Sequence, residues 1–360
     1  MERFEHGGNV YAHPGCVDFS ANLNPLGMPT SAREALRDAV DAFAAYPDPA
    51  CTELVARIAA FERVPQDWVV PCAGASDAFA RICQALRPSR ALLCAPCYSG
   101  YEQALEQVGS RVTYHDLSAH DDFAVTHDLV RDLEAGIDLL FLANPNNPTG
   151  RCVEPDVLES CVANARATST VVVLDECFID LVTHDGSGWS PGSNVLLSQN
   201  PNLVLVKALT KSFCLAGLRI GYALCSDVRL ATRLRDAGQP WAVSTPAQVA
   251  AVACLADEGA DYLDKSRELI ARERMRLEGA LRSKDLRVVP SEANYLLFYG
   301  PLGLAESLLD HGILIRSCDN YRGLDGRWYR IAVRTPREND MLIEALNRLF
   351  GPKGVLPFGS

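Results

Sequence analysis

Four short, nearly continuous apolar runs occur in the middle of the chain, at residues 91–95, 138–143, 171–174 and 203–206. Runs of this length are typical of strands buried on both faces, as in a parallel sheet that helices cover on each side. Helical patterns lie between the runs, for example at residues 155–167. This alternation predicts an α/β fold with a mostly parallel sheet covered by helices.

The C-terminal part, from about residue 250, has a different pattern. It predicts a long arginine-rich helix over residues 261–282, followed by short strands at 294–299, 313–316 and 329–333 with helices between them. We expect these elements to form a smaller α+β domain, to which the N-terminal segment also contributes.

The expected domain boundaries follow from this change of pattern. Residues 1–45 are expected to be an N-terminal segment that packs on the small domain. Residues 46–245 form the large domain, and residues 246–350 form the small C-terminal domain. The last residues, 351–360, are rich in glycine and proline, so we expect a flexible tail.

The formal net charge of the chain is -11. Nucleic acids and anionic membrane surfaces are bound by basic faces, so neither is expected as a partner. No stretch reaches the roughly 18 consecutive apolar residues that a membrane span requires. The first ten residues also lack the apolar core of a signal peptide. We therefore expect a cytoplasmic protein.

Thirteen cysteines are present in the chain. Without a sign of export, most are expected to be small buried hydrophobic residues and not members of disulfides. Cys94 and Cys97 have the C-x-x-C spacing of redox and zinc sites, but no second pair or histidine stands at metal-ligand spacing. We expect a structural role for this pair and no metal site.

Polar residues follow the predicted strands at the points where the strands end. Tyr98, Asn147, Asp175 and Lys211 each come shortly after a different apolar run. In open α/β sheets, ligands bind outside the carboxyl ends of the strands. We therefore expect these four side chains to gather at one edge of the sheet.

A fifth strand, predicted at residues 68–72, leads through the small-residue turn 73–77 into an amphipathic helix. The free backbone N–H groups and the macrodipole at the start of a helix favour a phosphate group. The same edge of the sheet is thus expected to combine an aromatic ring, an amide, a carboxylate, an amine and an anion-binding helix end.

The motif at residues 144–150, NPNNPTG, is a turn by composition. Its three asparagines and two prolines directly after a buried strand exceed what a tight loop requires. With Asp175 after the next run and Lys211 after the one beyond, the chain resembles the fold type I family of pyridoxal 5′-phosphate (PLP) enzymes, the aspartate-aminotransferase type. The order of motifs matches from His6 to Arg334, which is nearly the whole chain.

The resemblance implies that Lys211 holds PLP as a Schiff base and then moves protons. Lys207, in the same stretch, is the alternative. Lys211 is preferred because Arg219 lies eight residues beyond it, as the phosphate-binding arginine does in the family. Asp175 would pair with the pyridine nitrogen and keep it protonated, so that the ring withdraws electrons.

Further cofactor roles follow from the same resemblance. Asn147 resembles the residue that hydrogen-bonds the phenolic oxygen of PLP, and Tyr98 the ring that stacks on the pyridine. Tyr46 resembles the tyrosine that reaches the phosphate in the neighbouring subunit, which implies a homodimer. The residues expected to bind the phosphate within the chain are Ala75, Ser76, Thr210 and Arg219. We take Lys211, Asp175 and Tyr98 as the candidate catalytic residues.

Two positions depart from the family pattern. Residue 208 is alanine where many relatives have a hydroxyl residue, so the phosphate has one donor fewer. Residue 178 is phenylalanine where the aminotransferases of this group usually carry a tyrosine that supports the phenolic oxygen. The second departure weakens the assignment as an aminotransferase.

Arginines near the C-terminus concern the substrate, because a guanidinium group binds carboxylate or phosphate with a planar fork. By the resemblance, Arg330 aligns with the residue that binds the α-carboxylate of the substrate. Arg316 aligns with one that holds a distal phosphate. Arg322 and Arg334 remain open as substrate ligands or members of structural ion pairs.

The N-terminal residues His6, Gly7 and Gly8 form a donor-rich segment that could close over a substrate phosphate, with a surface tail as the alternative. This segment, the C-terminal arginines and Phe178 resemble the L-threonine-O-3-phosphate decarboxylases of cobalamin biosynthesis. Such enzymes release CO2 from L-threonine O-3-phosphate and form (R)-1-aminopropan-2-yl phosphate. L-serine O-phosphate remains open as a substrate.

Histidinol-phosphate aminotransferases and related class I/II aminotransferases are the alternative, because both reactions use the same kind of site. They differ in which bond at Cα stands perpendicular to the cofactor ring, and sequence does not show that angle. A PLP-fold binding protein without chemistry is less consistent with intact Lys211, Asp175 and Asn147. A nucleotide-binding oxidoreductase is not supported, since no G-x-G-x-x-G follows the first strand.

Overall fold

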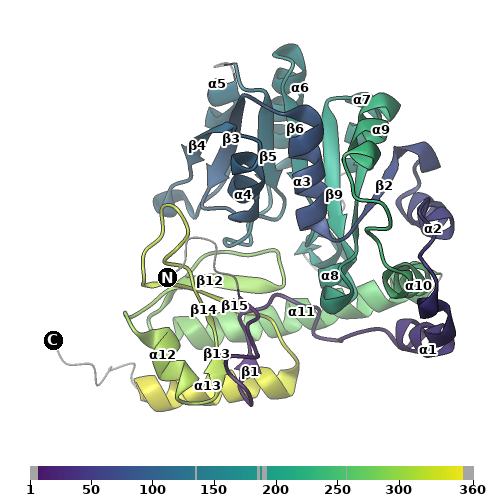
Figure 1. The fold of residues 1–360 in the computed structure, drawn as a ribbon. Helices are drawn as coiled ribbons and strands as arrows, with labels where there is room; N and C mark the ends of the chain where they lie inside the picture. The colour runs from purple at the N-terminus through teal and green to yellow at the C-terminus, as the bar shows by residue number, and fades with distance from the viewer. Residues whose placement is uncertain (1–6, 134–135, 185–186, 189–192, 257, 352–360) are drawn as a thin grey trace.

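The computed structural model describes residues 7–133, 136–184, 187–188, 193–256 and 258–351 of the 360-residue chain. Its two main sheets lie one above the other in Figure 1, and the long helix α11 (Glu258–Arg282) extends below them. The fold is the expected α/β architecture with a smaller α+β part. Within the described residues, no helix combines the length and apolar character needed to cross a membrane.

The larger sheet has seven strands in the order β2-β10-β9-β6-β5-β3-β4. The four apolar runs form β3, β5, β6 and β9, which pair in parallel, so this prediction is confirmed. β10 is antiparallel to both neighbours, which leaves the other six strands running in one direction. The strands are β2 (Val69–Cys72), β3 (Arg90–Ala95), β4 (Arg111–Asp116), β5 (Leu139–Ala143), β6 (Val171–Asp175), β9 (Leu203–Ala208) and β10 (Gly221–Cys225).

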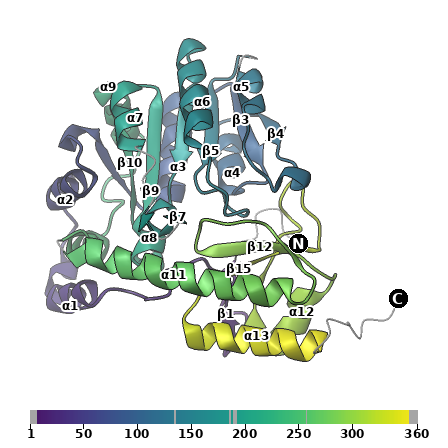
Figure 2. The same ribbon diagram turned by 180° about the vertical axis from the view of Figure 1, so that it is seen from behind.

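Helices cover both faces of this sheet, as Figures 1 and 2 show from opposite sides. One apolar cluster joins the sheet to α3 (Ala75–Leu86), α4 (Gly100–Glu106) and α9 (Val228–Asp236). A second cluster lies on the other face. It joins the sheet to α2 (Thr52–Glu62), α5 (Asp128–Leu133), α6 (Pro155–Ala167), α7 (Ser193–Gln199) and α10 (Thr245–Cys254). Burial on both faces explains why the central strands are almost wholly apolar.

The smaller sheet is antiparallel, with strand order β11-β12-β15-β14. Its strands are β11 (Arg287–Val288), β12 (Tyr295–Tyr299), β14 (Arg316–Ser317) and β15 (Trp328–Ala332). A separate apolar core packs it against α11, α12 (Leu304–Leu309) and α13 (Pro336–Phe350). The single strand expected at 313–316 is wrong in one respect, because it divides into β13 (Ile313–Leu314) and β14, which join different sheets.

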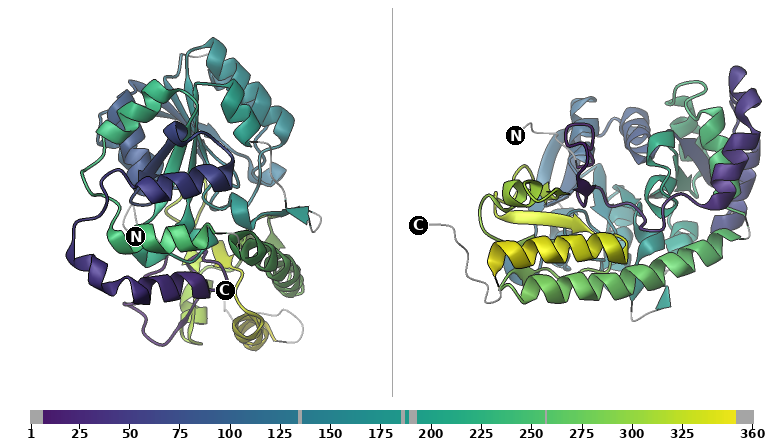
Figure 3. Two further views of the ribbon diagram at one scale, coloured as in Figure 1. Left: turned by 90° about the vertical axis from the view of Figure 1, so that its right-hand side faces the viewer. Right: turned by 90° about the horizontal axis from the view of Figure 1, so that it is seen from below.

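The N-terminal segment contacts two places. β1 (Val17–Asp18) pairs in parallel with β13 of the smaller part. Helix α1 (Thr30–Asp38) packs on α10, and both lie at the end of α11 in Figure 3. We retain the domain boundaries near residues 45, 245 and 350 as a proposal; the expected tail lies, from residue 352 onward, outside the described residues.

Candidate active site

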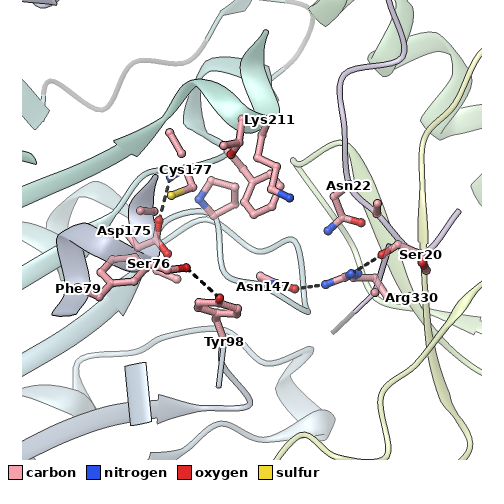
Figure 4. A pocket seen from close by; sticks show the side chains of 18 of the residues that line it. Ser20, Asn22, Ser76, Phe79, Tyr98, Asn147, Asp175, Cys177, Lys211 and Arg330 are labelled. Atoms are coloured by element: carbon pink, nitrogen blue, oxygen red, sulfur yellow. Dashed lines mark hydrogen bonds between the residues drawn. The ribbon is translucent and has the colours of Figure 1, made fainter. Parts of the chain in front are cut away.

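A cavity of about 270 Å³ opens between the carboxyl ends of the large sheet's strands and the smaller part of the molecule. Tyr98, Asn147, Asp175 and Lys211 all line it, each at or shortly after the end of a different strand. Figure 4 shows these side chains on one side and Arg330, Ser20 and Asn22 on the other. The structure therefore brings together the polar residues that the strand ends were expected to supply.

Lys211 lies on the short helix α8 (Leu209–Ser212), which begins where β9 ends. Its side chain points into the cavity, with Nζ 5.8 Å from the centre of the Phe178 ring. Burial, followed by the nearby charge of Arg330, lowers the pKa of Lys211 to about 8. A substantial fraction of this amine is therefore neutral near physiological pH and able to act as a nucleophile.

Lys207 has the opposite environment. Its Nζ lies 2.7 Å from Oε1 of Glu62 and 3.3 Å from Oδ1 of Asp180, in a buried network outside the cavity lining. Burial alone would lower the pKa of Lys207, but Asp180, Glu62 and Glu176 outweigh it and hold the pKa well above its ordinary value. This amine is a buried ammonium group with ion-pair partners.

Asp175 is the last residue of β6, and its carboxylate is buried at the cavity wall. Tyr101 donates a hydrogen bond to Oδ2, and the backbone N–H of Cys177 donates to Oδ1 at 2.9 Å. Burial raises the pKa of Asp175, while these hydrogen bonds and the charge of Lys211 act to lower it. A buried carboxylate in such a place favours a cationic partner.

The start of helix α3 forms an anion-binding corner. Ala75 and Ser76 line the cavity there, together with Thr210 and Arg219. Gly74, just before the helix, has φ +88°, and an ideal Cβ at this position would lie 2.7 Å from Nη2 of Arg219. Glycine is therefore needed for the guanidinium group to approach the helix end. Arginine, a hydroxyl group and free backbone N–H groups together suit a phosphate.

Tyr98 stands beside this corner. Its hydroxyl lies 3.3 Å from Oγ of Ser76. An ideal Cβ at Gly100 would lie 2.2 Å from the Tyr98 ring, so the absence of a side chain at Gly100 gives the ring its place. The tyrosine therefore presents a fixed aromatic surface to the cavity.

Arg330, on β15, connects the two parts of the molecule at the cavity. Its Nη1 donates to Oδ1 of Asn147, and its Nη2 donates to the backbone oxygen of Ser20 at 2.8 Å. Its buried Nε has no hydrogen-bond partner among the described residues. Arg330 thus enters the cavity with a donor still available for a ligand.

Arg316 lies opposite Arg330 in the register between β14 and β15. It is buried, donates to Oδ1 of Asn320 at 2.7 Å, and lies 5.8 Å from the ring centre of Tyr321. Tyr321 lines the cavity, whereas Arg316 is not among the residues that form its wall. The structure therefore places Arg316 behind Tyr321, next to the cavity.

The remaining expected residues lie in different places. Gly7 lines the cavity, and the N–H of Gly8 donates to Oγ of Ser20 at 2.7 Å. His6 is outside the described residues. Tyr46 is 82% exposed, packs beside Trp241 at 4.9 Å between ring centres, and does not line the cavity of its own chain.

Arg322 and Arg334, for which the sequence allows either a substrate-binding or a structural role, both have acidic partners. Arg322 forms an ion pair with Asp116 at 2.7 Å, and Arg334 forms one with Glu338 at 2.6 Å. Both contacts are consistent with structural ion pairs.

All thirteen cysteines are free thiols. Among the described residues, no group of three or more histidine, cysteine or acidic side chains could hold a metal ion.

Sequence reasoning missed several cavity residues, namely Ser20, Asn22, Cys177 and Tyr321. Asn22 and Tyr321 stand in turn-rich segments, where no strand end or helix start marks a side chain as facing a site. Tyr101 was missed because it falls on the apolar face of a helix and reads as an ordinary core residue. Its contact with Asp175 joins residues 74 positions apart, which no local pattern shows.

Comparisons with known proteins give consistent results. A family model described as aminotransferase class I and II matches residues 14–346. Threonine-phosphate decarboxylase from Salmonella typhimurium is 34% identical, over 98% of this chain and 98% of that protein. Histidinol-phosphate aminotransferase 1 from Cupriavidus pinatubonensis is also 34% identical, over 93% of this chain and 88% of that protein.

The fold agrees with a solved relative. The crystal structure of the histidinol-phosphate aminotransferase from Clostridium acetobutylicum superposes with a TM-score of 0.83 at 26% identity. The match covers 92% of this chain and 98% of the other.

Proposed function

Because the chain belongs to the class I and II aminotransferase family, we propose that it is a PLP-dependent decarboxylase of a small phosphorylated amino acid. The substrate we propose is L-threonine O-3-phosphate, with L-serine O-phosphate as a related possibility. The products are CO2 and (R)-1-aminopropan-2-yl phosphate, as required for cobalamin biosynthesis. The observation that carries the proposal is the match to a threonine-phosphate decarboxylase over 98% of both chains.

The cofactor of this family is PLP, and the residues around the cavity fit it. Lys211 is an amine with a pKa near 8, Asp175 is a buried carboxylate suited to a cationic ring nitrogen, and the start of α3 with Arg219 suits a phosphate. When bound, PLP supplies an electron sink that accepts the electrons of a bond at Cα. We assign its attachment to Lys211, its ring contacts to Tyr98 and Asn147, and its phosphate to Ala75, Ser76, Thr210 and Arg219.

Substrate binding is assigned to the opposite wall. The available Nε donor of Arg330 suits the α-carboxylate of an amino acid. Asn22 is 2% exposed, and its Oδ1 has no hydrogen-bond partner among the described residues, so it suits an N–H donor on the substrate. We propose that Arg316, Gly7 and Gly8 serve the distal phosphate, and we include His6 in this set by family resemblance alone.

The type of reaction depends on how these residues orient the substrate. We propose that Arg330 and Arg316 together fix the orientation of the substrate, so that with PLP bound the bond to the carboxylate would be the one that breaks. The carbon that loses CO2 must gain a proton. We assign its delivery to Nζ of Lys211, whose pKa of about 8 allows it to hold a proton and to release it.

Amine transfer from histidinol phosphate is the second candidate. It is favoured by the TM-score of 0.83 to the histidinol-phosphate aminotransferase from Clostridium acetobutylicum. It is also favoured by a second such enzyme, which is 34% identical to this chain, the same value as for the threonine-phosphate decarboxylase. Against it stands Phe178, a ring without the hydroxyl group that these aminotransferases usually carry. Phe178 lines the cavity and packs edge-on against Tyr295 at 5.0 Å, so no hydroxyl group is available at this position.

The test is a pair of assays on the PLP-loaded enzyme. With L-threonine O-3-phosphate we expect release of CO2 without any keto acid. Keto-acid-dependent amine transfer from histidinol phosphate, without CO2, would instead establish the second candidate.

We further propose that the enzyme is a cytoplasmic homodimer in which Tyr46 reaches the neighbouring site. Its thirteen free cysteines are compatible with a reducing compartment, because such compartments keep thiols reduced. The high exposure of Tyr46 leaves its ring accessible to a second subunit.

A further inference from the structure

Tyr101 is a buried tyrosine behind the cavity wall, in the first turn of α4 and three residues after Tyr98. Only 1% of its surface is exposed. Its ring stacks on Phe141 with 4.9 Å between ring centres and 8° between planes, and Phe79 packs edge-on against it at 4.9 Å. Rings on β5, α3 and α4 therefore fix the direction of the Tyr101 hydroxyl group.

That hydroxyl group donates to Oδ2 of Asp175. The other carboxylate oxygen accepts the N–H of Cys177 at 2.9 Å, and the Cys177 thiol also hydrogen-bonds with the carboxylate. Each oxygen of Asp175 is thus held by a donor from the protein. Lys211 is the nearby cation among the described residues that acts on this carboxylate.

The surroundings of Asp175 make this donor important. A carboxylate leaves water at a large cost in free energy unless hydrogen bonds replace its hydration. Hydrogen bonds donated to a carboxylate favour its charged form. Within the shelter of Phe79 and Phe141 such a bond is electrostatically stronger than in water. Loss of the Tyr101 hydroxyl group would leave Oδ2 with less stabilisation of its negative charge.

We propose that Tyr101 is a positioning residue for the cofactor, because its fixed hydroxyl group keeps Asp175 ionised and oriented to receive the cationic ring of PLP. This inference rests on the proposed pairing of Asp175 with PLP. It does not depend on which bond of the substrate is broken.

The test uses Tyr101→Phe, which keeps the ring and removes only the hydroxyl group. We expect the dissociation constant of PLP, measured by titrating apoprotein, to rise roughly tenfold to hundredfold, since hydrogen bonds to charged groups are the stronger ones. The absorbance spectrum of bound PLP is expected to change as well. An unchanged dissociation constant and spectrum would overturn the proposal.

Tyr222→Phe is the matched control. Tyr222 is also fully buried, and its hydroxyl group donates to Oε1 of Glu62 at 2.5 Å, outside the cavity lining. Removing this hydroxyl group should lower the urea midpoint of unfolding and leave the PLP dissociation constant within about twofold of the wild-type value. If the control weakens PLP binding as much as Tyr101→Phe, the effect is general destabilisation and the proposal is wrong.

The double variant Tyr101→Phe/Asp175→Asn distinguishes a failure of the role proposed for Tyr101 from a failure of the proposed pairing of Asp175 with PLP. If Tyr101 acts through Asp175, then Tyr101→Phe should weaken PLP binding no further in the Asp175→Asn background. Additive losses would contradict the proposed route. Normal PLP affinity of Asp175→Asn alone would instead refute the pairing of Asp175 with PLP.

Tyr101→His replaces Tyr101→Phe if the latter does not fold, because imidazole retains a ring and an N–H donor. The expected PLP dissociation constant is within about threefold of wild type if a donor is what the site needs. A loss as large as that of Asp175→Asn would contradict the proposal.

Discussion

Lys207 and Lys211 are separated by three residues and face different surroundings. Lys207 is held between Glu62 and Asp180, whereas Lys211 faces a cavity that also contains Arg330 and Arg219. Burial lowers the pKa of a lysine unless anionic partners compensate. The acidic partners of Lys207 retain its charge, and the cationic neighbours of Lys211 add to the effect of burial.

The first prediction concerns the pH dependence of cofactor attachment. An amine is nucleophilic only in its neutral form, so attachment should be slow below the pKa of Lys211 and should level off above it. We expect the rate for apoprotein mixed with PLP to rise with a midpoint near pH 8. The measurement is borohydride reduction at timed intervals and mass spectrometry of the peptide that contains Lys211. A midpoint above pH 10, or labelling at Lys207, would contradict the assignment.

Lys207 also connects secondary-structure elements. Its ion pairs join β9 to α2 and to η4 (Ile179–Leu181), the turn after Phe178. In the same network, Oγ of Ser212 on α8 donates to Asp180 at 2.8 Å. This network therefore links α2, β9, η4 and α8 outside the cavity lining and contributes to the stability of the fold.

The second prediction is that Lys207→Met destabilises the apoprotein by about 3–5 kcal/mol, because it leaves buried Glu62 and Asp180 without their cation. Urea unfolding measures this change. The control is Arg348→Met, which removes a well-exposed ion pair with Glu344 and should change the free energy of unfolding by less than about 1 kcal/mol. Equal effects of the two substitutions would show that the buried network is not stabilising.

The third prediction concerns the turn into α3. Gly74→Ala would place a Cβ 2.7 Å from Arg219 at a backbone φ of +88°. We expect Arg219 to be displaced and PLP to bind roughly tenfold more weakly, since a hydrogen bond between charged groups is worth about 1.5–3 kcal/mol. Gly279→Ala, in α11 with nothing within 4 Å of the new Cβ, should leave PLP binding unchanged. Undiminished affinity in Gly74→Ala would show that PLP binding does not depend on the close approach of Arg219 to the start of α3.

The central elements could be predicted from sequence because a strand buried on both faces leaves an unmistakable apolar run. β4 was not predicted, since it lies at the sheet edge and none of its residues is fully buried. β10 was not predicted either. It follows β9 after a twelve-residue connection, residues 209–220, which contains α8, and it runs antiparallel to both of its neighbours.

The cavity residues, like the strands, could be predicted where a local sequence pattern marks them. Side chains at strand ends, such as Asp175 and Lys211, could be placed together because parallel strands end at one edge. Asn22 and Tyr321 reach the cavity through long-range packing of the smaller part, and sequence contains no local sign of that contact. The same reason hides the hydrogen bond between Tyr101 and Asp175.

At the scale of the whole molecule, the cavity exists only where the large and small parts meet. Arg330 makes this connection, since it donates both to Asn147 after β5 and to Ser20 next to β1. Tyr46 is exposed and lies outside the cavity of its own chain, and in the proposed homodimer it would serve the site of the second subunit.

The fourth prediction tests that dimer by subunit complementation. Tyr46→Ala and Lys211→Ala chains should each be nearly inactive alone. A dimer containing one of each has one intact site, so unfolding and refolding an equal mixture should restore about a quarter of wild-type activity. No recovery in a mixture that sediments as a dimer would show that Tyr46 serves no neighbouring site.

The central claim is that this PLP enzyme removes CO2 from L-threonine O-3-phosphate and protonates the same carbon. The most direct measurement is NMR spectroscopy of the reaction in deuterium oxide with PLP-loaded protein and no keto acid. We predict 1-aminopropan-2-yl phosphate with a single deuterium on the carbon that lost CO2, formed in equal amount with CO2. Unreacted substrate under these conditions would contradict the account. Transfer of the amino group to an added keto acid, without release of CO2, would contradict it as well.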